Sequence, residues 1–192
     1  MRRIALFMHV SLDGFVAGPQ GEMDWITVSD DVFELAGQHT RGADTALYGR
    51  RTYDMMDAYW PTAGSQPKAS RHDIEHSAWY NSVRKVVVTR TLLGMQKPKT
   101  SFIGRDLPAE IASLKAEPGT GIVVFGSTST VHALTAHRLI DDYWLMLNPV
   151  LLGGGLPLFA DISERRRLRT ASSTLLPSGV VALHYRADDI TR

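Results

Sequence analysis

Residues 122–129 read Ile-Val-Val-Phe-Gly-Ser-Thr-Ser, an apolar run of strand length that ends at a glycine and continues into hydroxyl residues. A continuous apolar run is typical of a strand that is buried on both faces of a parallel sheet. Residues 127–139 then follow helical spacing, with Val131 and Leu134 on the inward face. This stretch therefore predicts a strand, a glycine turn and a helix, which together form the repeating unit of an α/β protein.

The same unit recurs on the N-terminal side. Residues 45–48 predict a short strand that ends at Gly49, and residues 50–58 predict a helix that Trp60 and Pro61 stop. Residues 62–82 show little periodicity, so they are predicted to form a long surface excursion. By the same criteria, further strands are predicted at 4–10, 85–89 and 102–103, and further helices at 28–40 and after Asp106.

The C-terminal part departs from this alternation. Residues 142–152 are extended in character, and two short apolar runs flank Pro177-Ser178-Gly179, which predicts an antiparallel hairpin. Strands that alternate with helices before this point require right-handed crossovers and parallel pairing. The sequence therefore predicts a single α/β domain over residues 1–192, with a mainly parallel central sheet and an antiparallel C-terminal hairpin.

The composition excludes several classes of function. With 21 Lys and Arg against 20 Asp and Glu, the net charge is +1, which is too small an excess for a nucleic-acid-binding face. The absence of cysteine excludes disulfides, thiolate metal sites and cysteine nucleophiles, and it fits a reducing compartment. The apolar run at residues 4–8 is too short for a signal peptide or a membrane span. We therefore expect a soluble cytoplasmic protein that binds neither nucleic acid nor membrane.

Two glycine turns form the candidate ligand site. Gly49-Arg50-Arg51-Thr52 and Gly126-Ser127-Thr128 each follow a predicted strand and open a helix. The start of a helix offers free backbone N–H groups to an anion, and glycine allows a phosphate to approach closely. Thr89 and Arg90 follow a third strand and could bind a ribose or its phosphate. Each turn alone could simply cap a strand, but together with Thr89-Arg90 they favour a nucleotide. Neither turn is a standard dinucleotide fingerprint or a P-loop.

Four motifs occur in the order expected of one known family. They are Ser11-Leu12-Asp13-Gly14-Phe15-Val16-Ala17-Gly18, Tyr48-Gly49-Arg50-Arg51-Thr52-Tyr53, Phe125-Gly126-Ser127 and the run from Asn148 to Gly155. The chain resembles the dihydrofolate-reductase-like proteins that are grouped with the C-terminal reductase domain of the bifunctional riboflavin-biosynthesis deaminase–reductase. The resemblance implies a dihydrofolate-reductase-like three-layer fold, NADPH as hydride donor and a homodimer.

The resemblance also implies roles for individual residues. Gly49, Arg50, Arg51 and Thr52 match the phosphate-binding turn of the family, and Gly126, Ser127 and Thr128 match the turn under the pyrophosphate. Thr89 and Arg90 match the contact to the adenosine ribose and its 2′-phosphate. Val16 and Ala17 fall in the loop that flanks the nicotinamide. Asp13, Gly153 and Gly154 border the substrate pocket.

The chain departs from its relatives at two places. The riboflavin-pathway reductases that it resembles carry a lysine where this sequence has Phe7, which puts binding of a phosphoribityl substrate in doubt. Dihydrofolate reductases have an acid five residues after a tryptophan, and Trp25 and Asp30 reproduce that spacing in different surroundings. Asp13 and Asp30 are the candidate catalytic residues, because either could relay a proton if burial raised its pKa. A structural role in a turn or a helix cap is the alternative for each.

The predicted activity is reduction of a C=N or C=O bond in a small pteridine- or pyrimidine-like heterocycle with NADPH. The alternatives are a nucleotide-binding dimer without turnover and a flavin-binding oxidoreductase. No metal site is predicted: His72 and His76 have metal-ligand spacing, but no third ligand is evident, so an exposed pair is expected. His9 is expected to be a satisfied polar group at a strand end. Residues 143–147 are rich in large apolar side chains and are the candidate dimer interface.

Overall fold

Strand β1 (Arg3–Ser11) lies near the middle of an eight-stranded sheet with the order β5-β4-β3-β6-β1-β7-β10-β9. The computed structural model describes residues 1–160 and 162–188, so residue 161 and residues 189–192 of the predicted domain lie outside the described residues. The remaining strands are β2 (Phe15–Ala17), β3 (Thr45–Gly49), β4 (Arg84–Val88), β5 (Thr100–Ile103), β6 (Gly121–Val124), β7 (Asp142–Asn148), β8 (Leu156–Pro157), β9 (Leu168–Leu175) and β10 (Val181–Ala187).

The pairing confirms the predicted fold class. All pairs from β5 across to β7 are parallel, whereas β10 pairs antiparallel with both β7 and β9. The predicted turn joins β9 to β10: the N–H of Gly179, at φ +87°, donates to Leu176 O at 2.9 Å. The antiparallel hairpin therefore ends a mainly parallel sheet, as the sequence indicates.

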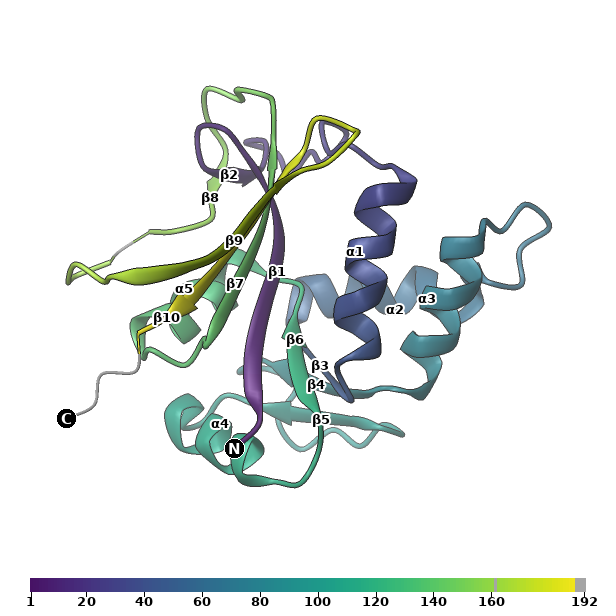
Figure 1. Cartoon of the computed structure of the whole chain (residues 1–192). Coiled ribbons are helices and arrows are strands. Elements are labelled where there is room, and N and C mark those ends of the chain that lie inside the picture. The colour runs from purple at the N-terminus through teal and green to yellow at the C-terminus, as the bar shows by residue number, and fades with distance from the viewer. Residues whose placement is uncertain (161, 189–192) are drawn as a thin grey trace.

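Helices cover the sheet on both faces and give the molecule three layers. They are α1 (Asp30–Arg41), α2 (Arg50–Ala63), α3 (Arg71–Ser82), α4 (Leu107–Ala116) and α5 (Thr128–Ala136). Figure 1 shows α1, α2 and α3 together on one side of the sheet. Val32, Tyr53 and Tyr80 of these helices share a buried cluster with strand residues of that face, while α4 and α5 contribute to a second cluster.

The alternation of side chains along the strands produces these two cores. In β1, Ile4 and Leu6 belong to the cluster under α4 and α5, whereas Phe7 belongs to the cluster under α1 to α3. In β3, Leu47 and Tyr48 divide in the same way. Successive residues of a strand point to opposite faces, so a strand that is covered on both sides must be apolar throughout. This requirement explains the continuous apolar runs in the sequence.

The prediction of a long surface excursion at residues 62–82 is wrong, because α3 occupies Arg71–Ser82. A capping box begins the helix: Ser70 Oγ accepts from the N–H of Asp73, and the Asp73 carboxylate accepts from the N–H of Ser70. The buried residues of α3 are His76, Ser77 and Tyr80. Since two of these are polar and the third carries a hydroxyl, the sequence shows no apolar stripe to indicate the helix.

Helix α2 also differs from its prediction, since Trp60 and Pro61 lie inside it and it continues to Ala63. A proline inside a helix removes one backbone donor and strains the preceding turn. Packing against α3 compensates here: the Trp60 ring lies 4.0 Å from that of His76, and Asn81 Nδ2 donates to Pro61 O at 3.1 Å. Tertiary contacts therefore outweigh the local stop signal.

The strand that was the candidate dimer interface is an interior strand. β7 pairs with β1 on one side and β10 on the other, and Tyr143 and Met146 are buried within the chain. Trp144 stacks on His184 of β10 with ring centroids 3.9 Å apart. By contrast, all eight residues of the edge strand β9 are exposed. The aromatic residues that indicated an interface thus already pack inside one chain.

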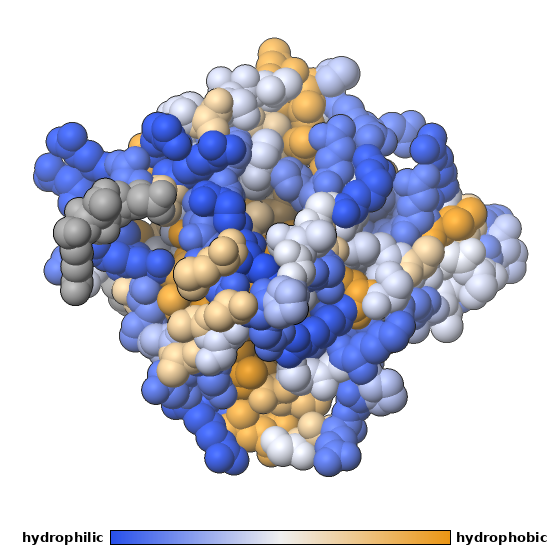
Figure 2. Space-filling model, turned by 60° about the horizontal axis from the view of Figure 1, so that its bottom comes forward, coloured by the Kyte–Doolittle hydropathy of each residue, from blue (hydrophilic) through white to orange (hydrophobic). Residues whose placement is uncertain are grey.

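The face of the molecule in Figure 2 is mostly hydrophilic, with apolar residues gathered in a few separate patches. Single exposed apolar side chains such as Leu151 and Leu175 are ordinary on a protein surface. Among the described residues, none of the helices has both the length and the apolar character needed to cross a membrane.

Candidate functional site

A cavity of about 920 Å³ opens where three neighbouring parallel strands end. Its walls come from the turns after β3, β4 and β6, together with residues of β1 and β2. This is the edge at which open α/β sheets bind ligands. Ten of the eleven residues predicted to bind the cofactor line the cavity: Val16, Ala17, Arg50, Arg51, Thr52, Thr89, Arg90, Gly126, Ser127 and Thr128.

The eleventh residue, Gly49, links the two glycine turns through a backbone hydrogen bond. It is buried, and its N–H donates to Gly126 O at 2.9 Å. A Cβ atom at Gly49 would overlap the hydroxyl oxygens of Ser127 and Thr130. Only glycine lets the turn after β3 come this close to the turn after β6. Gly49 therefore does not line the cavity, but it holds together the two turns that do.

Helices α2 and α5 both begin at this cavity with open N-termini. Their N-cap residues, Gly49 and Ser127, make no side-chain cap hydrogen bond, and neither helix has an acid in its first turn. By contrast, Ser70 and Asp106 cap α3 and α4 with side-chain oxygens. The first N–H groups of a helix are without intrahelical partners and carry a partial positive charge. Two such ends on one cavity favour an anion with several oxygens.

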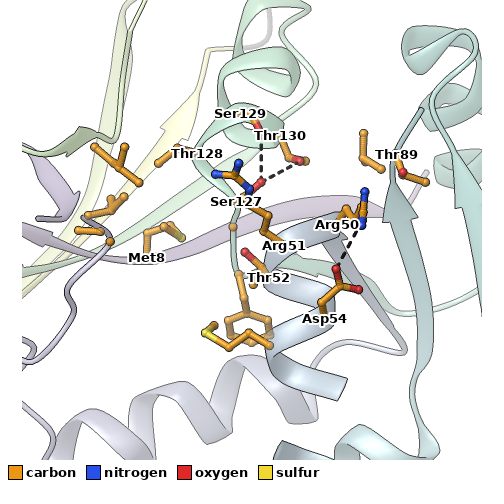
Figure 3. Close-up of a pocket in the computed structure, with 18 of the residues that line it drawn as sticks. Met8, Arg50, Arg51, Thr52, Asp54, Thr89, Ser127, Thr128, Ser129 and Thr130 are labelled. Atoms are coloured by element: carbon orange, nitrogen blue, oxygen red, sulfur yellow. Dashed lines mark hydrogen bonds and ion pairs between the residues drawn. The ribbon is translucent and has the colours of Figure 1, made fainter. Parts of the chain in front are cut away.

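The charged side chains reinforce this preference. Arg50, Arg51 and Arg90 line the cavity, and Asp54 is the only acid among the described residues that line it. Figure 3 shows the Arg50–Asp54 pair, in which Arg50 Nε lies 3.5 Å from a carboxylate oxygen. Arg50 also donates to the Thr91 hydroxyl at 3.2 Å, which links α2 to the turn after β4. The cavity therefore carries a net positive charge beside hydroxyl groups, which suits phosphates and a ribose.

A second, smaller cavity of about 220 Å³ continues from the first. The two cavities share Met8, Val16, Met23, Met55 and Phe125. The smaller one extends between β1 and the three helices α1, α2 and α3, and none of the described residues that line it is charged at neutral pH. A large polar cavity thus leads into a small apolar one.

Three histidines line the second cavity: His9, His72 and His76. Burial lowers the pKa of His9 to about 4 and that of His76 to about 3, and it also lowers the pKa of His72. Their rings are therefore neutral at physiological pH. The expectation of an exposed His72–His76 pair is wrong, since His76 is 9% exposed and His72 stacks on Phe33 with centroids 3.7 Å apart.

Asp13, a candidate catalytic acid, connects two loops. Its carboxylate accepts hydrogen bonds from the Ser11 hydroxyl at 2.7 Å and from the N–H groups of Leu152 and Gly153 at 3.1 and 2.7 Å. These bonds, the one from Ser11 first, lower the pKa of Asp13. A proton donor needs the opposite shift. Asp13 therefore stays ionised and holds the loop after β1 against the loop after β7.

The other residues expected near the substrate also lie outside the two cavities. Asp30 is exposed at the first position of α1, and neither Gly153 nor Gly154 lines a cavity. The neighbouring acid Asp31 accepts from the Ser29 hydroxyl and from the N–H of Ser178 at 3.0 Å, and these bonds lower its pKa to about 2. The geometry thus gives no support to a catalytic role for Asp30.

The lining of the second cavity was not predicted from the sequence. Its walls combine Phe7 and His9 of β1 with residues of all three helices on that face and with Phe125. The only hint in the sequence was the spacing of His72 and His76, which places both on one side of a helix. Among the described residues, there is no cluster of three or more His, Asp or Glu side chains that could hold a metal ion.

Comparison with known proteins gives consistent results. The family model of the RibD C-terminal domain matches residues 2–182. The uncharacterized protein YyaP of Bacillus subtilis is 34% identical over 188 residues, which cover 96% of this chain and 94% of YyaP.

Two solved structures show the same fold at low sequence identity. The diaminohydroxyphosphoribosylaminopyrimidine deaminase/5-amino-6-(5-phosphoribosylamino)uracil reductase of Thermotoga maritima superposes with a TM-score of 0.68 at 17% identity, over 97% of this chain and 56% of that one. Dihydrofolate reductase of Enterococcus faecalis, solved with NADP(H), superposes with a TM-score of 0.63 at 13% identity, over 97% of both chains. The dihydrofolate-reductase-like fold is therefore shown.

Proposed function

Because this chain belongs to the RibD C-terminal domain family, we propose that it is an NADPH-dependent reductase of a C=N or C=O bond in a small heterocyclic compound. The observation that carries the proposal is the pair of uncapped helix N-termini that open on one cavity lined by three arginines. Family membership supports a reductase, and the cavity supports a dinucleotide as its reductant. The related fold of a dihydrofolate reductase solved with NADP(H) agrees with this choice.

The residues present fit NADPH at three points. The N–H groups at the starts of α2 and α5, with Arg51 and the Ser127 hydroxyl, would hold the pyrophosphate. Arg90 and the hydroxyl of Thr89 would hold the adenosine ribose and its 2′-phosphate, because a guanidinium binds a phosphate with two parallel hydrogen bonds. Val16 and Ala17 are buried and apolar, and they would flank the nicotinamide.

NADPH bound in the first cavity would supply a hydride for an electrophilic carbon of the substrate, and a proton from water would complete the reduction at the adjacent heteroatom. The residues that line the two cavities would position the cofactor and the substrate. The junction of the two cavities, formed by Met8, Val16 and Phe125, is where a substrate in the smaller cavity would meet a cofactor in the larger one. Asp13 is ionised, so it would contribute by fixing the loops and not by donating a proton.

We also propose that the protein forms a homodimer, through a surface other than the interior strand β7. The edge strand β9 offers its unpaired backbone groups and eight exposed residues. Size-exclusion chromatography with light scattering tests this. A monomer at micromolar concentration would contradict it.

A titration of the purified protein with NADPH and with NADH, followed by fluorescence, tests the cofactor assignment. We expect NADPH to bind more tightly than NADH. The double variant Arg50→Ala, Arg51→Ala should lower the affinity for NADPH by about ten-fold or more, because each lost charged hydrogen bond is worth about 1.5–3 kcal/mol. The variant Arg90→Ala should reduce the preference for NADPH over NADH. Arg71→Ala is the matched control, since Arg71 is exposed on α3 and pairs with Glu75 outside both cavities.

The outcomes separate the alternatives. Failure of both nucleotides to bind would overturn the proposal. Tight NADPH binding with no turnover of any pteridine, pyrimidine or quinone would indicate a nucleotide-binding protein of the same fold. A flavin absorbance in the purified protein would indicate a flavin-dependent oxidoreductase instead.

A further inference from the structure

The second cavity combines a small volume with an uncharged lining. An apolar cavity of about 150 Å³ is enough to hold benzene, so 220 Å³ is suited to a compound of one or two fused rings. Three aromatic side chains, Phe7, Phe33 and Phe125, contribute flat walls. Aromatic walls pack well against planar rings, whereas a buried charge without a partner would be costly.

Methionines supply much of the remaining wall. Met8, Met23, Met55 and Met56 line this cavity. Methionine is unbranched and flexible, so it adapts to ligands of somewhat different outline. The lining therefore selects for flatness and lack of charge more than for one particular outline.

His9 is a polar residue in the lining of this cavity, and its hydrogen bonding depends on the neighbouring Asn148. Asn148 is completely buried; its Oδ1 accepts from the N–H of Thr27 at 2.9 Å and its Nδ2 donates to Met146 O at 2.9 Å. These two backbone partners fix which way the amide points. Its Nδ2 then also donates to Nδ1 of His9 at 3.4 Å.

This contact decides the tautomer of His9. A neutral imidazole carries its proton on one nitrogen only, so an accepting Nδ1 requires the proton to be on Nε2. No hydrogen-bond partner of Nε2 occurs within residues 1–160 and 162–188. His9 is therefore more than the satisfied polar group expected from the sequence, because one of its nitrogens remains available to a ligand. A second unpartnered atom, Nε2 of the buried His76, lies on another wall.

We propose that the second cavity binds an uncharged, planar ring compound without a phosphate group, and that Nε2–H of His9 donates a hydrogen bond to a carbonyl oxygen or ring nitrogen of that compound. The inference rests on the proposed reductase function, since it assigns the substrate class of the same site. The proposed ligand lacks the phosphoribosyl group of a riboflavin-pathway substrate. None of the described residues that line the second cavity is a lysine or arginine that could bind a phosphate, and Phe7 occupies part of the wall.

Three bicyclic probes of similar size test the substrate class by ligand-observed NMR: quinazolin-4-one, naphthalene and 2-naphthyl phosphate. Quinazolin-4-one presents a carbonyl, naphthalene has no polar atom, and naphthyl phosphate is charged. We expect quinazolin-4-one to bind at least about ten-fold more tightly than naphthyl phosphate. Equal or tighter binding of the phosphate, or no binding of the two uncharged probes, would overturn the proposal.

The variant His9→Leu tests the hydrogen bond. A net hydrogen bond of about 0.5–1.5 kcal/mol corresponds to about a two- to ten-fold loss in affinity. We expect that loss for quinazolin-4-one and no change for naphthalene, with His137→Gln as the exposed control. Equal losses for both uncharged probes would show that His9 only fills space.

Two further measurements complete the test. In the unaltered protein, nitrogen NMR should show His9 protonated on Nε2, and that N–H signal should shift when quinazolin-4-one is added. A proton on Nδ1, or a signal that does not respond, would overturn the assignment even if the variant fails to fold. The NADPH titration is run in parallel on every variant. If the unaltered protein binds quinazolin-4-one but not NADPH, the cofactor proposal alone is refuted.

Discussion

The buried neutral histidines of the second cavity should make the protein sensitive to mild acid. His9 and His76 have folded-state pKa values of about 4 and 3, against an ordinary value of 6.5. Burial is the main cause for both, and the neighbouring His72 further lowers the pKa of His76. As the pH falls below 6.5, the unfolded chain takes up protons that the folded chain does not. Stability should therefore be unaffected above that pH and should fall as the pH decreases towards 4.

The size of the stability loss follows from the difference between the pH and the pKa of histidine in the unfolded chain. At about pH 5, the pH lies about 1.5 units below the pKa of a histidine in the unfolded chain, and each unit corresponds to about 1.36 kcal/mol. Each should therefore cost about 2 kcal/mol, and the two together about 4 kcal/mol, as an upper estimate. A domain has only about 5–15 kcal/mol of net stability. In a chain of this length, about 2 kcal/mol corresponds to a shift of about 4–8 °C in Tm.

Urea denaturation of the unaltered protein and of His76→Gln, at about pH 7.5 and about pH 5, measures the effect. Whatever the stability of the variant at about pH 7.5, its loss of stability between the two pH values should be smaller by about 2 kcal/mol, because glutamine does not titrate. His137→Gln, at an exposed site, should keep the loss of the unaltered protein. An identical loss in His76→Gln and the unaltered protein would refute the reasoning.

Three further predictions concern the core under α5, the contact between the two glycine turns and the loop that Asp13 holds. Leu134→Ala, in α5 where Leu134 is fully buried, should cost about 2–5 kcal/mol of unfolding free energy in a denaturant titration, and a cost below about 1 kcal/mol would argue against the observed core. Gly49→Val should push apart the turns after β3 and β6, so that NADPH affinity measured by fluorescence falls by about ten-fold or more; retained affinity would show that the turns can separate freely. Asp13→Ala should speed hydrogen exchange at the N–H groups of Leu152 and Gly153, whereas unchanged exchange would mean that other contacts hold the loop.

The parts of the fold that could be predicted are those with a local cause. The strand at residues 122–124 is buried on both faces, so every residue in it is apolar, and the glycine after it marks the turn. Helix α3 could not be predicted in this way, because His76, Ser77 and Tyr80 face the core without forming an apolar stripe. Its place depends on tertiary contacts with α2 and Phe125.

The residues of the site likewise fall into those in local motifs, which could be predicted, and those that depend on contacts distant in the sequence. The two glycine turns are short local motifs, so the sequence could indicate the residues of both turns that line the first cavity. The behaviour of Asp13 depends on N–H groups at residues 152 and 153, far along the chain, which lower the pKa of a carboxylate that the sequence analysis treated as a possible acid. The second cavity depends on α3, so missing that helix also meant missing the cavity.

The methionines that line the two cavities have a consequence for the lifetime of the protein. Met8, Met23 and Met55 belong to both linings, and Met23 and Met55 are 44% and 46% exposed. The chain has no cysteine, so these thioethers are the sulfur atoms that an oxidant in the cavity would meet. Oxidation to the sulfoxide turns a flexible apolar side chain into a polar one, and cellular sulfoxide reductases reverse it. Peroxide damage would thus convert the apolar wall shared by the two cavities into a polar one, and enzymatic repair would restore it.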